Sequence, residues 1–231
     1  TSETCFWRVH KVARHFLPAL EWIYARIRPK SHHYTFRLQI YKLLLSRLQK
    51  KYRGYKIPLR AEGQDVLHEL MQNRTPSLII SPHLRLTTIL GYHLEQQGHR
   101  LAVLANVDPN IEGLNFGMKS QLEYIPADLT CLLKIRRCLR SGTPVLAMPD
   151  YEIRKEKNKL TKYISPNIFT MAEALGAAVT FMWVDMEQDG AVVLRFKRQH
   201  TIKGTDMADA FRCFVLEHSQ WNAEVRERRV A

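Results

Sequence analysis

Apolar runs of strand length, separated by amphipathic stretches, constrain the fold of this chain more than any other feature. Residues 77–81 form such a run, Ser-Leu-Ile-Ile-Ser, with Pro76 before it and Pro82 after it. A short apolar run between residues that interrupt regular structure is typical of a strand buried on both faces. The same pattern predicts further strands over residues 101–106, 123–125, 144–148, 178–185 and 191–197.

The stretches before and between these strands have the spacing of amphipathic helices. Apolar residues at helical spacing predict helices over residues 5–28, 32–53, 62–73, 84–97, 114–121, 129–140, 166–175 and from about 206 to 228. Buried strands that alternate with such helices predict an α/β fold, with a mostly parallel central sheet flanked by helices. Because no Pro/Gly/Ser-rich linker interrupts the chain, we expect a single domain in which a basic helical segment, residues 1–58, precedes an α/β core, residues 59–231.

The charge of the chain predicts an anionic partner. Thirty-five Lys and Arg residues against 22 Asp and Glu give a net charge of +13, and the basic residues crowd residues 8–60 and 134–162. Nucleic acid, an anionic membrane, a phosphorylated cofactor and an acidic carrier protein all satisfy such a charge. Nucleic acid is the weakest of these alternatives, because no helix-turn-helix, RNA-recognition or zinc-finger signature accompanies the charge.

Composition also limits where the protein works. Four cysteines, with no C-x-x-C pair among them, argue against a zinc site or a disulfide framework and favour a reducing, cytoplasmic compartment. No stretch of about 20 apolar residues is present, so we expect no transmembrane helix and no intact signal peptide. Residues 6–24 alternate aromatic and aliphatic residues with cations. That pattern fits a segment lying on the inner face of the cell membrane, and equally a basic helix packed on its own domain.

Polar residues follow several of the predicted strands directly. These are Pro82-His83, Asn106-Val107-Asp108 and Pro149-Asp150-Tyr151-Glu152. In open α/β sheets the carboxyl ends of the strands form the ligand crevice, so we expect the site there. His83 lies between a strand and a helix, where an imidazole can take a proton from a hydroxyl or amine that attacks an acyl carbon. The alternative is that His83 has only a structural role.

The order of these elements resembles the lysophospholipid acyltransferase superfamily, nearest the lipid A biosynthesis (lauroyl/myristoyl) acyltransferase branch. The resemblance covers roughly residues 60–200 and is carried by His83 and by residues 101–106, 122–126, 140–152 and 171–179. It implies a glycerol-3-phosphate/lysophospholipid acyltransferase-like fold and peripheral membrane attachment. It also implies transfer of an acyl group from an acyl carrier protein or coenzyme A thioester to a hydroxyl or amine, with His83 as general base and no bound cofactor.

The chain departs from the family pattern at two positions. The acidic residue that the family has after His-x4 is Thr88 here, and Ala105-Asn106 stands where an arginine is expected. A carboxylate beside a catalytic imidazole fixes its tautomer and stabilises its protonated form. Either Thr88 or its neighbour Thr87 remains a candidate to hydrogen-bond the ring, and Asp108, Asp150 or Glu152 to supply the carboxylate. The missing arginine predicts an acceptor other than a lipid A precursor.

The strand-end residues and the resemblance together indicate a set of candidate site residues. The catalytic candidates are His83, with Asp150 and Glu152 as His-orienting or pocket-shaping groups. The candidate substrate contacts are Arg85, Thr87, Thr88, Asn106, Asp108, Asn115, Lys119 and Arg154. We expect the basic run 154–162 to be a loop, which either receives the phosphopantetheine phosphate or the acidic helix of a carrier protein, or is merely solvated. We expect no metal.

Two other functions remain open at this stage. One is a non-catalytic relative that binds a membrane, an acyl chain or a carrier protein, and Thr88 is its best support. The other is a basic nucleic-acid-binding protein.

Overall fold

The computed structural model describes residues 59–72, 75–84, 86–111, 122–156, 159–187, 191–200, 203–219 and 222–225, with the single residues 19, 22, 23 and 43. For residues 70, 71, 92, 96, 152–156, 159, 160 and 222 it describes the backbone alone. The helices predicted over 5–28, 32–53 and 114–121 therefore lie outside the described residues, apart from those single positions. No helix in the described part of the chain is long and apolar enough to cross a membrane.

Seven strands form the central sheet of the described residues. They are β1 (Leu59–Glu62), β2 (Ser77–Ile80), β3 (Ala102–Ala105), β4 (Glu123–Pro126), β5 (Val145–Ala147), β8 (Ala178–Met186) and β9 (Val192–Gln199). Their order is β1-β9-β8-β2-β5-β3-β4, and neighbouring strands run parallel except β8 and β9. This confirms the predicted α/β fold with a mostly parallel sheet. Strand β1 was not predicted.

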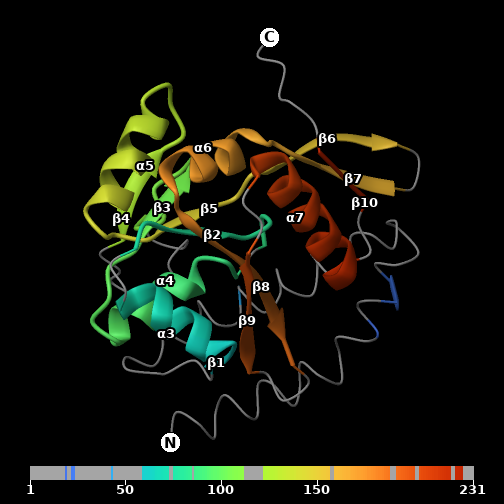
Figure 1. Ribbon diagram of the computed structural model, residues 1–231. Coiled ribbons are helices and arrows are strands. Elements are labelled where there is room, and N and C mark those ends of the chain that lie inside the picture. Colours follow the sequence, from blue (N-terminus) through green and yellow to red (C-terminus); the bar gives the residue numbers. More distant parts are fainter. Residues whose placement is uncertain are drawn as a thin grey trace, which may run out of the picture.

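Helices cover both faces of this sheet. They are α3 (Gln64–Gln72), α4 (Ile89–Gln96), α5 (Cys131–Arg140), α6 (Asn167–Leu175) and α7 (Gly204–His218). Helices α3 and α4 lie on one side of the sheet, and α5, α6 and α7 on the other (Figure 1). For the helices that connect parallel strands, this follows from right-handed crossovers, because the chain moves one way along the sheet from β2 through α4 to β3, and the other way from β4 through α5 to β5 and from β5 through α6 to β8.

Aromatic side chains fill the layer between α6, α7 and strand β8. Phe181 of β8 lies 5.1 Å from Phe211 and 5.5 Å from Phe214, both on α7, measured between ring centroids. Phe169 of α6 and Trp183 of β8 extend the group, and all five rings are buried. Each buried aromatic side chain contributes a large apolar area, so this layer is a major part of the core.

A second, three-stranded sheet lies beside the first, and it corrects two predictions. It contains β6 (Asp150–Glu156), β7 (Lys159–Ile164) and β10 (Asn222–Val225), with β6 and β7 paired antiparallel. The basic run 154–162, predicted as a loop, therefore belongs to a hairpin. The closing helix, predicted to continue to about 228, ends at His218, and residues 222–225 instead pair in parallel with β7. Such pairing depends on a partner strand far away in the chain, so local propensity does not reveal it.

The connection from β2 to α4 corrects a third prediction. The helix predicted from residue 84 begins at Ile89. The N–H of Leu84 donates to the carbonyl of Pro82 over 2.7 Å and to the hydroxyl of Thr87 over 3.3 Å. Hydroxyl side chains near a helix start offer the backbone such alternative partners, and here they replace the first helical turn with tighter turns.

Candidate functional site

The ends of β2 and β5 place His83 beside Asp150. Within the sheet, Ile80 pairs with Ala147 in parallel register, at the last residue of each strand. His83 lies three residues beyond Ile80, and Asp150 lies three residues beyond Ala147. Equal offsets from paired positions on neighbouring parallel strands bring the two residues to the same point at the carboxyl edge of the sheet.

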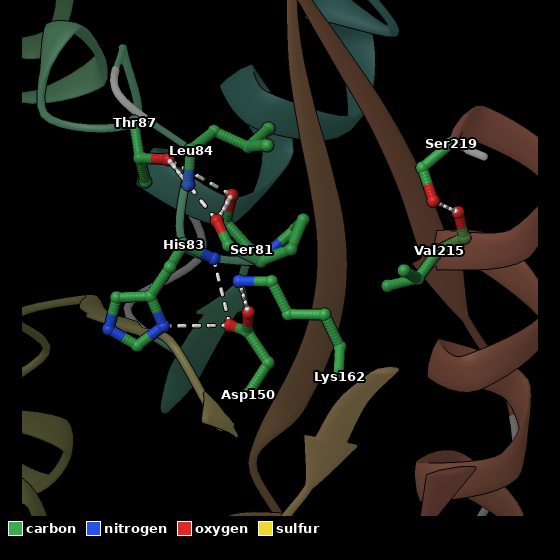
Figure 2. A network of polar contacts seen from close by, with 9 residues as sticks. Ser81, His83, Leu84, Thr87, Asp150, Lys162, Val215 and Ser219 are labelled. Atoms are coloured by element: carbon green, nitrogen blue, oxygen red, sulfur yellow. Dashed lines mark hydrogen bonds and ion pairs between the residues drawn. The ribbon is translucent and has the colours of Figure 1, made fainter. Parts of the chain in front are cut away.

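A hydrogen bond joins the imidazole of His83 to the carboxylate of Asp150. The distance from Nδ1 to Oδ1 is 2.8 Å, and the same oxygen accepts the backbone N–H of His83, also at 2.8 Å (Figure 2). The His83 side chain is 48% exposed, whereas that of Asp150 is 1% exposed. The carboxylate is therefore buried beneath an imidazole that remains accessible from solvent.

Lys162 completes the group from the second sheet. Its ammonium Nζ donates to Oδ2 of Asp150 over 2.7 Å, and its side chain is 10% exposed. In the β6–β7 hairpin, Asp150 pairs with Ile164 and Glu152 pairs with Lys162, so Lys162 is a diagonal neighbour of Asp150. Long side chains reach diagonal neighbours across an antiparallel pair.

Its two side-chain partners, His83 and Lys162, determine the ionisation of Asp150. Burial raises the pKa of this carboxyl, but the hydrogen bond from His83 and the positive charge of Lys162 together outweigh burial and lower the pKa to about 2. Asp150 is therefore ionised at neutral pH and accepts hydrogen bonds only. It follows that Nδ1 of His83 carries the proton in this contact, and that Nε2 of the neutral ring offers a lone pair away from the carboxylate.

The turn after β2 holds His83 in place. The Thr87 hydroxyl is buried, donates to the carbonyl of Pro82 over 3.3 Å and lies 3.5 Å from the hydroxyl of Ser81. Thr88, which immediately precedes α4, is half-buried. Among the groups considered as partners of the ring, it is thus the Asp150 carboxylate that contacts Nδ1, while Thr87 supports the turn (Figure 2).

The other carboxylate candidates occupy different places. Asp108, in the segment after β3, accepts the backbone N–H of Asn110 through Oδ1 over 2.8 Å. Asn106 directly follows the same strand and is exposed. Glu152 and Arg154 belong to β6, and the structure describes their backbone alone. The site roles of these four residues stay predictions.

The remaining candidates, Arg85, Asn115 and Lys119, lie outside the described residues. Sequence reasoning missed Lys162 as a site residue, although it belongs to the basic run that we singled out. A signal was present, since Lys162 lies two residues before the buried Ile164 and so shares its face of a strand.

The described residues also bear on metal-binding clusters and on the buried thiol of Cys138. They contain no group of three or more His, Cys, Asp or Glu side chains that could hold a metal ion. Cys138 is buried on α5 and donates from Sγ to Oε1 of Glu123 over 3.4 Å. Burial, with help from that carboxylate, raises the pKa of the thiol to about 11, so Cys138 is not a nucleophile at neutral pH.

No protein-family model matches this chain, and no curated protein matches it. The geometry of the site and the order of elements in the sequence are therefore the observations that bear on function.

Proposed function

We propose that the protein is an acyltransferase, which moves an acyl group from an acyl carrier protein or coenzyme A thioester to a hydroxyl or amine acceptor. The observation that carries the proposal is the half-exposed His83 whose Nδ1 contacts the buried, ionised Asp150 at the carboxyl edge of the sheet. The resemblance of the element order to the lysophospholipid acyltransferase superfamily supports the reaction class. We also propose that the α/β fold is the acyltransferase fold of that superfamily.

In the proposed reaction His83 acts as general base. Its Nε2 takes the proton from the acceptor O–H or N–H while the acceptor oxygen or nitrogen attacks the thioester carbonyl carbon. The tetrahedral intermediate then expels the thiolate by breaking the carbon–sulfur bond, and the imidazolium returns its proton to that sulfur. Asp150 stabilises the imidazolium formed between the two steps. This direct route needs no covalent enzyme intermediate.

Asp150 takes the role that Thr88 cannot perform. In the resembling family the orienting carboxylate comes from the same turn as the histidine. Here the carboxylate contacting the ring comes from the neighbouring strand end, and Lys162 holds its second oxygen. A carboxylate with two fixed partners has little freedom to rotate, so the ring that it binds is held in one orientation. We infer that this arrangement replaces the family dyad.

The β6–β7 hairpin is the proposed contact for the donor. It begins at Asp150, contains the described part of the basic run 154–162, and returns to Asp150 through Lys162. A thioester whose carbonyl meets His83 would place its phosphopantetheine phosphate, or the acidic helix of its carrier protein, within reach of such a hairpin. With Ala105-Asn106 in place of the expected arginine, the proposed acceptor is not a lipid A precursor.

Mass spectrometry of acyl products tests the proposal. The protein is incubated with acyl-carrier-protein and acyl-coenzyme A panels plus hydroxyl and amine acceptors, and wild type is compared with His83→Ala. His68→Ala, which removes an exposed imidazole on α3, is the matched control. We expect product with wild type and the control, and a loss of about 10²–10⁴-fold with His83→Ala.

Two results would replace the proposal with another function. Tight thioester binding without transfer, unchanged by His83→Ala, would indicate a non-catalytic binding protein. DNA binding of sub-micromolar affinity with steep salt dependence, in the absence of thioester binding, would indicate a nucleic-acid-binding protein.

A further inference from the structure

Helix α5 exposes leucines and arginines together on one face. Ile135, Cys138 and Leu139 pack into the core from its inner face. The outer face carries Leu132, Leu133, Arg136, Arg137 and Arg140, all exposed. Residues 132, 136 and 140, and likewise residues 133 and 137, are four apart, so the two rows lie next to each other along one side of the helix. Leu129, fully exposed two residues before the helix, extends this face, which we call the α5 surface.

The apolar part of the α5 surface is unusual for this molecule. From residue 59 onward, the exposed large hydrophobic side chains in the described part of the chain are Val107, Ile111, Leu129, Leu132, Leu133 and Leu216. Half of these belong to the α5 surface, and Leu133 is 68% exposed. Scattered exposed leucines need no explanation, but three in one short segment indicate a surface that another apolar phase covers.

The charge of the α5 surface selects the kind of partner. None of the guanidinium groups of Arg136, Arg137 and Arg140 forms an ion pair within the described residues. Asp128, the acidic residue nearest the start of the helix, is paired with Lys134 over 3.3 Å. The surface therefore presents cations beside leucines with no compensating acid of its own. In amphipathic helices at the bilayer interface, leucines insert into the bilayer and the flanking arginine side chains extend to the lipid phosphate groups.

We propose that the α5 surface docks the protein on an anionic lipid bilayer. Leu129, Leu132 and Leu133 enter the headgroup region, and the three arginines contact lipid phosphates. This inference is independent of the acyl-transfer proposal, because it rests on exposure and charge on α5 and uses no residue of the dyad. It also differs from membrane contact by residues 6–24, which lie outside the described residues apart from positions 19, 22 and 23.

The position of the α5 surface relates the bilayer to the site. Leu129 lies three residues beyond Pro126, the last residue of β4. Strands β4, β3, β5 and β2 are parallel neighbours in that order, so the leucine end of α5 is at the same sheet edge as His83 and Asp150. A bilayer bound there lies at the edge of the molecule where the dyad opens.

Vesicle co-sedimentation tests the docking surface on the full chain, with no thioester or acceptor present. Phosphatidylcholine vesicles with and without phosphatidylglycerol are compared for wild type, Leu132→Ser/Leu133→Ser and Arg136→Gln/Arg137→Gln/Arg140→Gln. Leu216→Ser and Arg212→Gln, both on α7, are the matched controls. We expect wild type and the controls to bind the anionic vesicles more tightly than the neutral ones.

The two α5 variants have separate expected effects. The arginine variant should bind anionic vesicles roughly 100-fold more weakly, because each cation near such a surface contributes about a fivefold factor. The leucine variant should lose at least about tenfold on both kinds of vesicle, since burial of apolar area is lost. Hydrogen exchange of residues 129–140 should slow when wild type is bound to vesicles.

Several results would overturn the inference. One is unchanged vesicle binding by both α5 variants with unchanged exchange at residues 129–140. Another is a wild-type dimer that the leucine variant dissociates, which would assign the surface to a second copy of the chain. A third is that the α5 variants lose binding to a soluble acidic carrier protein but keep binding to vesicles. Because no acyl transfer is measured, failure here leaves the proposed function to its own test.

Discussion

Two histidines at the ends of secondary-structure elements show how differently the same ring is used. His83 follows strand β2, is about half exposed and has its Nδ1 2.8 Å from a buried carboxylate. His218 is the last residue of α7, and its Nδ1 donates to the backbone carbonyl of Phe214 over 2.9 Å. The His218 ring lies 4.5 Å from that of Phe214 and 5.3 Å from that of Trp183.

The difference between the two rings lies in the partner of Nδ1. A carbonyl oxygen fixes the orientation of a ring without adding a full charge to compensate for protonation. An ionised carboxylate fixes the orientation of the ring and also supplies a full negative charge. That charge stabilises the imidazolium that forms when the ring accepts a proton. Under the proposed function His83 is the ring that transfers a proton, whereas His218 closes the end of the aromatic layer. Four predictions test this contrast.

Asp150→Asn should have the largest effect. It removes the carboxylate beneath His83 and leaves the buried Lys162 without its counter-charge. We expect acyl transfer to fall on the order of 10³–10⁴-fold and the free energy of unfolding to drop by about 3–5 kcal/mol. Product formation per folded molecule and urea unfolding measure the two effects. The double variant Asp150→Asn/Lys162→Met should regain most of the stability but none of the transfer. Transfer within tenfold of wild type in Asp150→Asn would refute the role of this carboxylate.

Lys162→Met should have the next largest effect. The substitution removes the ammonium that contacts Oδ2 of Asp150, so only His83 still offsets the burial of this carboxyl. The pKa of Asp150 should therefore rise. We expect a loss of about 3 kcal/mol in unfolding free energy and a pH–rate profile whose acidic limb moves to higher pH. The control is Lys197→Met, which breaks the exposed pair with Glu217 and should cost less than about 1 kcal/mol. An unmoved acidic limb would show that Lys162 supports the fold alone.

Acid should weaken the wild-type protein through Asp150. Because the folded-state pKa of about 2 lies below the ordinary value of 3.8, ionised Asp150 stabilises the fold above about pH 4. This contribution, about 2 kcal/mol, is lost as pH falls from about 4 through about 2. Urea unfolding of wild type and Asp150→Asn/Lys162→Met across that range isolates it. A constant difference between the two proteins would contradict the lowered pKa.

His218→Leu should have the smallest effect and should separate the two histidines most clearly. Losing the ring contacts and the bond to Phe214 should lower the unfolding free energy by about 1 kcal/mol. Acyl transfer per folded molecule should stay at the wild-type level, in contrast to His83→Ala. Thermal unfolding and the mass-spectrometric assay measure these effects side by side. A tenfold or larger fall in transfer would end the distinction drawn between the two rings.

Much of the site could be predicted because it lies at strand ends. Pro82-His83 and Pro149-Asp150 each follow an apolar run, and such runs reveal buried strands without knowledge of their neighbours. The partner of His83, however, could not be chosen from the sequence. The choice among Asp108, Asp150 and Glu152 depended on the adjacency of β2 and β5, and strands β3 and β4 lie between these two in the chain.

Lys162 could not be selected from the sequence either, because its burial also depends on which strands pair. In sequence it is one of several lysines in a basic run, and its spacing from Ile164 indicates a shared face only once residues 159–164 are known to form a strand. Its burial arises from the antiparallel pairing of β6 with β7, which carries its stem over the end of the central sheet to Asp150. The early end of α7 and the pairing of residues 222–225 with β7 also depend on this second sheet.

By itself, the sequence determined the alternation of strands and helices, the mostly parallel sheet and the strand-end positions of His83 and Asp150. These features follow from hydrophobic periodicity and from proline and glycine, which act within a few residues. Tertiary structure decided the strand order, the 2.8 Å contact between His83 and Asp150 and the burial of Lys162. Those features require segments far apart in the chain to meet, and their free energy comes from pairing and burial that no single segment contains.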